Sequence, residues 1–135
     1  NDAVEIGNEY FMKEGFDATI VVPGDIPLID NQVLDKLFEQ VDNNQVIITP
    51  SRREDGTNLL FRNPPDIIQT SYDSNSYFTH LKMIKNNNLQ YSIYLEDAIR
   101  LDLDEPEDID IINMKLLDSR TKNLLKRIIS RQKSR

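Results

Sequence analysis

The stretch ATIVVPGDIPLI, residues 18–29, decides how the chain is built. Residues 18–22 are a short apolar run, which is typical of a buried strand. The Pro-Gly pair at 23–24 predicts a tight turn, and Asp25 follows it directly. In open α/β sheets, ligands bind just beyond the carboxyl ends of the strands. Asp25 is therefore a candidate site residue, and the alternative is a plain turn or cap residue.

Outward from this stretch, helix and strand patterns alternate along the chain. Asp30 is expected to cap a helix that follows the turn, and Asp104 to cap a later one. Helices are expected over residues 2–14, 31–41, 76–85, 105–117 and in the C-terminal tail, and strands over 18–22, 46–49, 59–61, 90–95 and 101–104. The alternation predicts a layered α/β domain with a mostly parallel sheet.

The composition is that of one globular domain. The 135 residues are 39% hydrophobic and 29% charged, a balance that separates the chain from disordered sequences. The chain contains no cysteine, so disulfides and thiolate metal sites are excluded. No apolar run approaches the roughly 20 residues of a membrane helix. We expect a cytoplasmic protein that does not bind membranes.

The charge is divided unevenly between a body and a tail. The chain carries −7, but from Ser119 onward it has seven basic residues and no acid, so the body before Ser119 carries −14. An acidic body argues against a nucleic-acid partner. We therefore divide the chain into residues 1–118, the domain, and residues 119–135, a basic amphipathic helix. We expect a homodimer, although the apolar side of this helix is equally suited to packing on the body.

Two segments carry side chains suited to binding an anionic ligand. In the loop at residues 50–58, Gly56 permits close backbone approach, while Thr57 and Asn58 offer a hydroxyl and an amide. A solvated hairpin loop is the simpler interpretation of that spacing. In residues 72–80, Ser76 lies where a helix is expected to begin, and helix N-termini bind anions. His80 is the single histidine, for which a structural or substrate-shaping role is expected.

A third segment, LDLDEPED at residues 101–108, is acidic. As a strand it would place Asp102 and Asp104 on one face, whereas Glu107 and Asp108 suit the N-terminus of the following helix. Together with Asp25, either strand carboxylate is suited to hold magnesium on a nucleotide's phosphates. The pattern does not choose between Asp102 and Asp104.

In this order and spacing, the motifs closely resemble the 2-phospho-L-lactate guanylyltransferase family of the CofC/FbiD type. The resemblance rests on PGDIPLI (23–29), DGTN (55–58), the Tyr72/Ser76/His80 spacing and LDLDEPED (101–108), and extends from residue 1 to about 115. It implies a three-layer Rossmann-like (GT-A-like) nucleotidyltransferase fold with a mixed, mostly parallel sheet. The DGTN loop and the Tyr/Ser/His segment distinguish this family from other nucleotidyltransferases with that fold.

The resemblance also implies an activity. GTP would donate a guanylyl group to 2-phospho-L-lactate, or to phosphoenolpyruvate in some relatives, and release pyrophosphate on the route to coenzyme F(420). Asp25 would be catalytic as a magnesium ligand, with Asp104 favoured over Asp102 as the second ligand. Thr57 and Ser76 match residues that hold the acceptor's phosphate and carboxylate. The acceptor site would also include Gly56, Asn58, Asp73 and His80.

Two departures qualify the resemblance. Asp73 stands where the family usually has glycine, and a carboxylate there repels a bound phosphate unless it points away or reaches the metal. The family's first strand and Gly-rich basic loop, which hold the nucleotide, have no counterpart, so we expect an N-terminal truncation of roughly 60–70 residues. The alternatives are a related nucleotidyltransferase with another acceptor and an inactive fragment that serves as an interaction module.

Overall fold

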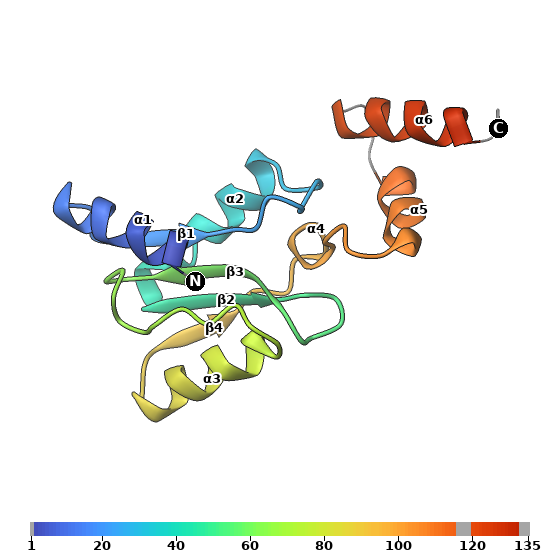
Figure 1. Ribbon diagram of the computed structural model, residues 1–135. Helices are drawn as coiled ribbons and strands as arrows, with labels where there is room; N and C mark the ends of the chain where they lie inside the picture. Colours follow the sequence, from blue (N-terminus) through green and yellow to red (C-terminus); the bar gives the residue numbers. More distant parts are fainter. Residues whose placement is uncertain (1, 116–119, 133–135) are drawn as a thin grey trace.

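The computed structural model of the chain describes residues 2–115 and 120–132 (Figure 1). Its elements, in chain order, are α1 (Asp2–Lys13), β1 (Thr19–Val21), α2 (Asn31–Phe38), the 3-10 turn η1 (Val41–Asn43), β2 (Val46–Pro50), β3 (Thr57–Arg62), α3 (Ser76–Asn86), β4 (Tyr91–Ile93), α4 (Asp97–Arg100), α5 (Pro106–Lys115) and α6 (Arg120–Gln132). The expected helix end near residue 117 and the boundary between residues 118 and 119 lie outside the described residues.

The strands form one mixed sheet in the order β1-β3-β2-β4. β3 pairs antiparallel with β1 and with β2, whereas β2 and β4 pair in parallel. The mixed α/β fold is confirmed, but the expectation that most neighbouring strands are parallel needs correction. β1, β2 and β4 share one direction, and the reversed β3 lies between two of them. The cause is the short loop at residues 51–56, because a parallel connection needs roughly a dozen residues or more.

Side chains of β2 alternate between two cores, which makes the domain three-layered. Val46 and Ile48 pack with Ile84 of α3 on one face. Ile47 packs with Leu37 of α2 on the other face. Figure 1 shows α3 and α2 on opposite sides of the sheet. The predicted three-layer arrangement is therefore confirmed, and a strand buried on both faces explains the continuous apolar run.

Local signals set the ends of two helices as expected. The Asp30 carboxylate accepts a hydrogen bond from the Val33 N–H over 3.0 Å and so caps α2. Just beyond α1, Gly15 has a φ of 83°, which glycine adopts without strain. α1 contacts β1, and its Glu5 accepts hydrogen bonds from the main chain and hydroxyl of Thr70. The helix is thereby tied to the segment that leads into α3.

The C-terminal helices form a smaller cluster beside the sheet (Figure 1). Its buried members are Leu101, Ile112 and Leu125. Leu125 of α6 is only 7% exposed, but Leu124 and Ile128 of the same helix are 58% and 46% exposed. None of the described helices is long and apolar enough to cross a bilayer. One side of α6 therefore packs on the body, while apolar side chains beside it face outward.

Candidate functional site

A cavity of about 350 Å³ lies at the carboxyl end of β2, between the β2–β3 loop and the start of α3. It is lined by Asp55, Gly56, Thr57, Asn58, Tyr72, Asp73, Ser74, Asn75, Ser76 and Asp104. Most of the residues expected to bind the acceptor thus meet in one place, although they come from two segments, and Asp104 joins them from a third. A hollow of about 660 Å³ lies near the opposite ends of these strands, around residues 41–45, and contains none of the motif residues.

The β2–β3 loop is closed by its own hydrogen bonds. The Ser51 hydroxyl donates to Asp55 Oδ1 over 2.9 Å and accepts from the Gly56 N–H over 3.1 Å. The Ser51 N–H donates to the Gly56 carbonyl over 2.8 Å. The hydroxyl of Ser51 also holds the pKa of Asp55 below its usual value. The loop is therefore preorganised, and it presents Thr57 at a defined position.

Two hydroxyls meet at the floor of the cavity. Ser76 Oγ lies 3.3 Å from Thr57 Oγ1, and both residues are buried. Ser76 is the first residue of α3, whose N-terminal main-chain N–H groups favour an anion. The Tyr77 N–H is directed to the Asp55 carbonyl over 3.4 Å, which ties this helix end to the loop. The arrangement offers hydroxyls and a helix N-terminus to a small anionic ligand.

His80 lies behind the cavity and does not line it. The ring is fully buried, with Nδ1 3.0 Å from Thr57 Oγ1 and Nε2 3.0 Å from the Ser71 main-chain nitrogen. The Tyr72 ring packs edge-on against it, with 5.4 Å between ring centroids. Burial, assisted by the positive charge of Arg62, lowers the pKa of His80 to about 4. A neutral ring in contact with Thr57 is thus separated from any ligand in the cavity.

Asn58 serves the fold as well as the cavity wall. Its side-chain amide donates to the carbonyls of Ile99 and Arg100, over 3.0 and 3.2 Å. These bonds hold the end of α4 against the start of β3. The donors of Asn58 are consequently engaged within the protein, and its carbonyl oxygen is the remaining polar atom.

The segment with Asp102 and Asp104 is not a strand, contrary to expectation. Residues 101–104 follow α4 as irregular chain, and the Leu103 N–H donates to the Asp25 carbonyl over 3.0 Å. The α4 turn, which the alternating pattern did not predict, redirects the chain away from the sheet. This contact nevertheless brings the Asp25 turn and the acidic segment side by side, as a shared site requires.

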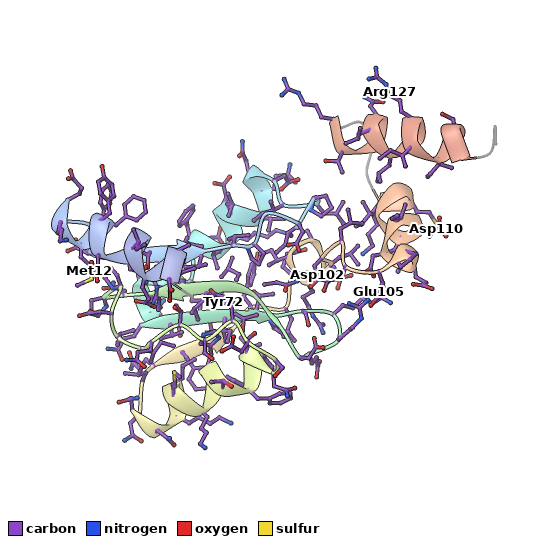
Figure 2. All side chains as sticks on the ribbon, in the orientation of Figure 1. Met12, Tyr72, Asp102, Glu105, Asp110 and Arg127 are labelled. Carbon is purple, nitrogen blue, oxygen red and sulfur yellow. The ribbon has the colours of Figure 1, made fainter. Side chains whose placement is uncertain are left out.

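The three acids differ in their surroundings. Asp25 is exposed, and Asp104 lines the cavity. Asp102 is only 9% exposed, and among residues 2–115 and 120–132 no donor forms a hydrogen bond with its carboxylate. Figure 2 shows Asp102 beside α4, before the turn at Glu105 that leads into α5. Within those same residues, no three acidic or histidine side chains converge closely enough to hold a metal by themselves.

An ion pair beside these acids was missed by sequence reasoning. Arg53 Nη2 lies 3.2 Å from the Asp108 carboxylate, and Nη1 lies 3.8 Å from Asp104. Asp108 also accepts from the N–H groups of Glu105 and Asp104, over 2.9 and 3.3 Å. These main-chain bonds, with a smaller effect from Arg53, lower the pKa of Asp108.

Because α5 begins at Pro106, the residue before it is Glu105 and not the predicted cap, Asp104. Asp108 accepts from the N–H groups of the two residues that precede the helix. The available signal was the acid three residues after Glu105, the spacing of a capping box. The Arg53 guanidinium thus contacts carboxylates of the protein.

Comparisons with known proteins agree with the geometry. A family model described as "Guanylyl transferase CofC like" matches residues 1–134, so the match extends beyond residue 115 through α6. The chain is 39% identical over 107 residues, 79% of its length, to the 2-phospho-L-lactate guanylyltransferase of Methanocaldococcus jannaschii. It is 31% identical over 97 residues, 71% of its length, to the phosphoenolpyruvate guanylyltransferase of Thermobaculum terrenum.

The fold has a solved counterpart. A crystal structure described as a nucleotide-diphospho-sugar transferase from Desulfovibrio desulfuricans superposes with a TM-score of 0.72. The match covers 95% of this chain and 58% of that one, at 16% identity. The two relatives above are covered over 47% and 42% of their length. The chain therefore spans about half the length of the relatives that it matches.

Proposed function

We propose, from the premise that this chain belongs to the CofC-like guanylyl transferase family, that it contributes the acceptor site of a guanylyltransferase. GTP is the donor, and the acceptor is a small acid that carries a phosphate and a carboxylate. 2-Phospho-L-lactate is the first candidate, because it appears in the name of the 39% identical relative. Phosphoenolpyruvate is the second, from a 31% identical relative. The proposed place of the reaction is coenzyme F(420) biosynthesis.

The observation that carries this proposal is the cavity that collects the motif residues. Thr57 and Ser76 offer hydroxyls, and the N-terminus of α3 adds main-chain donors beside them. A phosphate or carboxylate suits such a group of donors. The cavity is also lined by the carboxylates of Asp55, Asp73 and Asp104, which suit a cation bound together with the anion.

The chemistry needs alignment more than a protein nucleophile. An oxygen of the acceptor's phosphate attacks the α-phosphorus of GTP, the new phosphoanhydride bond forms, and pyrophosphate leaves with the electrons of the broken bond. No redox partner is needed. The role of Thr57, Ser76 and the α3 N-terminus is to fix the attacking phosphate in line with the donor, which lowers the entropic part of the barrier.

The proposed site includes magnesium, because the cavity proposed to bind the anionic acceptor is itself lined by acids. Asp55, Asp73 and Asp104 line it, and their charges would repel a phosphate unless a cation intervenes. Magnesium usually takes one or two carboxylates plus substrate phosphates, so a full protein cage is not required. Asp25 with Asp102 or Asp104 would hold it. Asp104 lines the cavity, and the carboxylate of the 9% exposed Asp102 accepts no hydrogen bond among residues 2–115 and 120–132, which fits this use. When bound, the ion neutralises charge on the phosphates.

The test uses the complete protein that carries this chain, with GTP, magnesium and each acceptor in turn. Pyrophosphate release and the guanylylated product are measured together. We expect turnover with one of the two acceptors and a loss of at least about a hundredfold for Asp25→Asn, as for removal of an electrostatic group at a reacting centre. Asp42→Asn, an exposed acid in η1, is the matched control. Absence of turnover with both acceptors, or a fully active Asp25→Asn variant, contradicts the proposal.

A further inference from the structure

The His80 ring connects a main-chain donor to the hydroxyl pair of the cavity. The Ser71 N–H is 3.0 Å from Nε2, and a main-chain amide only donates. Nε2 must therefore be the accepting nitrogen, and a neutral ring then carries its proton on Nδ1. Nδ1 is 3.0 Å from Thr57 Oγ1, so the ring donates to Thr57.

The segment that sets this tautomer is held from two sides. Arg62, which is fully buried, donates from Nη1 to the Ile68 carbonyl over 2.9 Å. Glu5 of α1 accepts from the N–H and hydroxyl of Thr70. Ser71 follows directly, and its N–H is thereby aimed at His80. The pKa of about 4, caused by burial and the Arg62 charge, keeps the ring neutral at ordinary pH.

The tautomer decides what the hydroxyl pair offers to a ligand. Thr57 and Ser76 have two hydroxyl protons, and one of them forms the 3.3 Å bond between them. Because His80 donates to Thr57, the second proton is not consumed by the ring and remains available to the cavity. With the opposite tautomer, Thr57 would donate its proton to His80. Ser76 would still donate to Thr57, so neither hydroxyl would have a proton left for a ligand.

We propose that His80 is a positioning residue, which makes the Thr57–Ser76 pair a hydroxyl donor toward an anionic oxygen of the acceptor, in a phosphate or carboxylate group. His80 itself is buried and does not line the cavity. Its effect passes through Thr57, with Ser71 as the second anchor. This inference rests on the proposed function, since it names how that acceptor site is prepared.

Two substitutions separate the two hydrogen bonds of the ring. In His80→Asn the carboxamide nitrogen falls near the position of Nδ1 and keeps the donor to Thr57. In His80→Gln the terminal oxygen reaches toward the position of Nε2 and keeps the acceptor for Ser71 but not the donor. For His80→Gln we expect the acceptor KM to rise about tenfold to a hundredfold, the scale of one hydrogen bond to a charged group, with the GTP KM unchanged. His80→Asn should recover most of that loss.

A double-mutant cycle tests the route through Thr57. Thr57→Val removes the hydroxyl while keeping the shape, and its own loss should match that of His80→Gln. Adding His80→Gln to Thr57→Val should cause little further loss, because the two act through one contact. The positioning role is overturned if the rises in acceptor KM of the two single variants multiply in the double variant. It is also overturned if His80→Asn and His80→Gln raise the acceptor KM equally at unchanged melting temperatures.

A measurement without turnover distinguishes this inference from the proposed function. His80 is the single histidine, so nitrogen-15 spectra of its ring report the tautomer directly. We expect a proton on Nδ1 and none on Nε2, and the reverse result overturns the inference. If the wild-type protein transfers no guanylyl group, the proposed function fails alone. Titration with inorganic phosphate then decides: tighter binding by His80→Asn than by His80→Gln supports positioning, and equal binding refutes it.

Discussion

The Leu103 N–H donates to the Asp25 carbonyl over 3.0 Å and so joins two acidic segments that are 78 positions apart in the chain. This bond places the turn after β1 beside the irregular segment after α4. The main chain, rather than the side chains, makes the connection. The two acidic segments are therefore held side by side without any attraction between their carboxylates.

Asp102→Asn should lower activity while raising stability. Asp102 is 9% exposed, and its carboxylate accepts no hydrogen bond among residues 2–115 and 120–132. Arg53 attracts it only through its charge, and a largely desolvated charge without a hydrogen bond costs stability. Without magnesium we expect a rise in melting temperature of roughly 2–6 °C, the equivalent of about 1 kcal/mol. With magnesium, GTP and acceptor, we expect a large loss of turnover.

Asp104→Asn is the matched comparison, because its exposed carboxylate offers no such gain in stability. Thermal melts with and without magnesium, read beside activity, check both variants. A lower melting temperature for Asp102→Asn would show that its charge serves the fold.

Asp108→Asn should destabilise the protein in a manner that depends on pH. The bonds from the Glu105 and Asp104 N–H groups, together with Arg53, lower the pKa of Asp108 in the folded state. A lowered carboxyl pKa contributes stability above its unfolded value, near 3.9, and that contribution is lost as pH falls through the folded value.

We therefore expect Asp108→Asn to cost about 1 kcal/mol at neutral pH, the usual scale of a helix cap. Denaturant unfolding at pH 7 and at pH 3 or below measures the difference. The difference in the free energy of unfolding between wild type and variant should become smaller as the pH falls. A difference that stays constant would show that the variant loses packing and not a charge interaction.

His80 should remain neutral far below the usual range of histidine. Its pKa is lowered to about 4, whereas the unfolded value is near 6.5. Between about pH 4 and 6.5 the unfolded state binds more protons at this ring than the folded state does. The ring's contribution to stability is therefore complete above about pH 6.5 and decreases as the pH falls toward 4. A nitrogen-15 titration of the single histidine should show a midpoint near 4. A midpoint above 6 would contradict the buried, neutral ring.

α6 is expected to provide the contact of a homodimer. Leu124 and Ile128 expose apolar surface beside the basic residues of this helix, and the acidic body of a second copy complements that charge. Sedimentation should show a dimer that dissociates in Leu124→Glu/Ile128→Glu.

Leu125→Ala is the control for α6. This residue is buried, so its truncation should cost about 2–3 kcal/mol of stability while the dimer persists at temperatures where the variant is folded. If the wild-type protein is monomeric at micromolar concentration, the dimer prediction is wrong and α6 serves to pack on its own chain.

Part of the fold and of the cavity was predictable from local chemistry. The strand expected at residues 46–49 and the Asp30 cap each depend on a few neighbouring residues, and both are confirmed. Of the residues assigned to the site from the sequence, Gly56, Thr57, Asn58, Asp73, Ser76 and Asp104 line one cavity, whereas Asp25, Asp102 and His80 do not line it. The structure shows that the residues lining this cavity lie close together, whereas their roles remain predictions.

The rest depended on contacts between distant segments. The reversed β3 between β1 and β2 follows from how a short loop folds back, and the pattern of a buried strand does not state its direction. Asp108 was given to the helix dipole because the position of Arg53 was not visible in the spacing.

The amino-acid sequence by itself determined which chemical groups are present and which family the chain resembles, because side-chain identity and spacing carry that information. Only the tertiary structure decided that His80 stands behind Thr57 and not in the cavity, and that a main-chain N–H of Ser71 sets its tautomer. The physical reason is that burial and hydrogen-bond direction depend on contacts between distant segments, so the sequence of a single segment does not specify them.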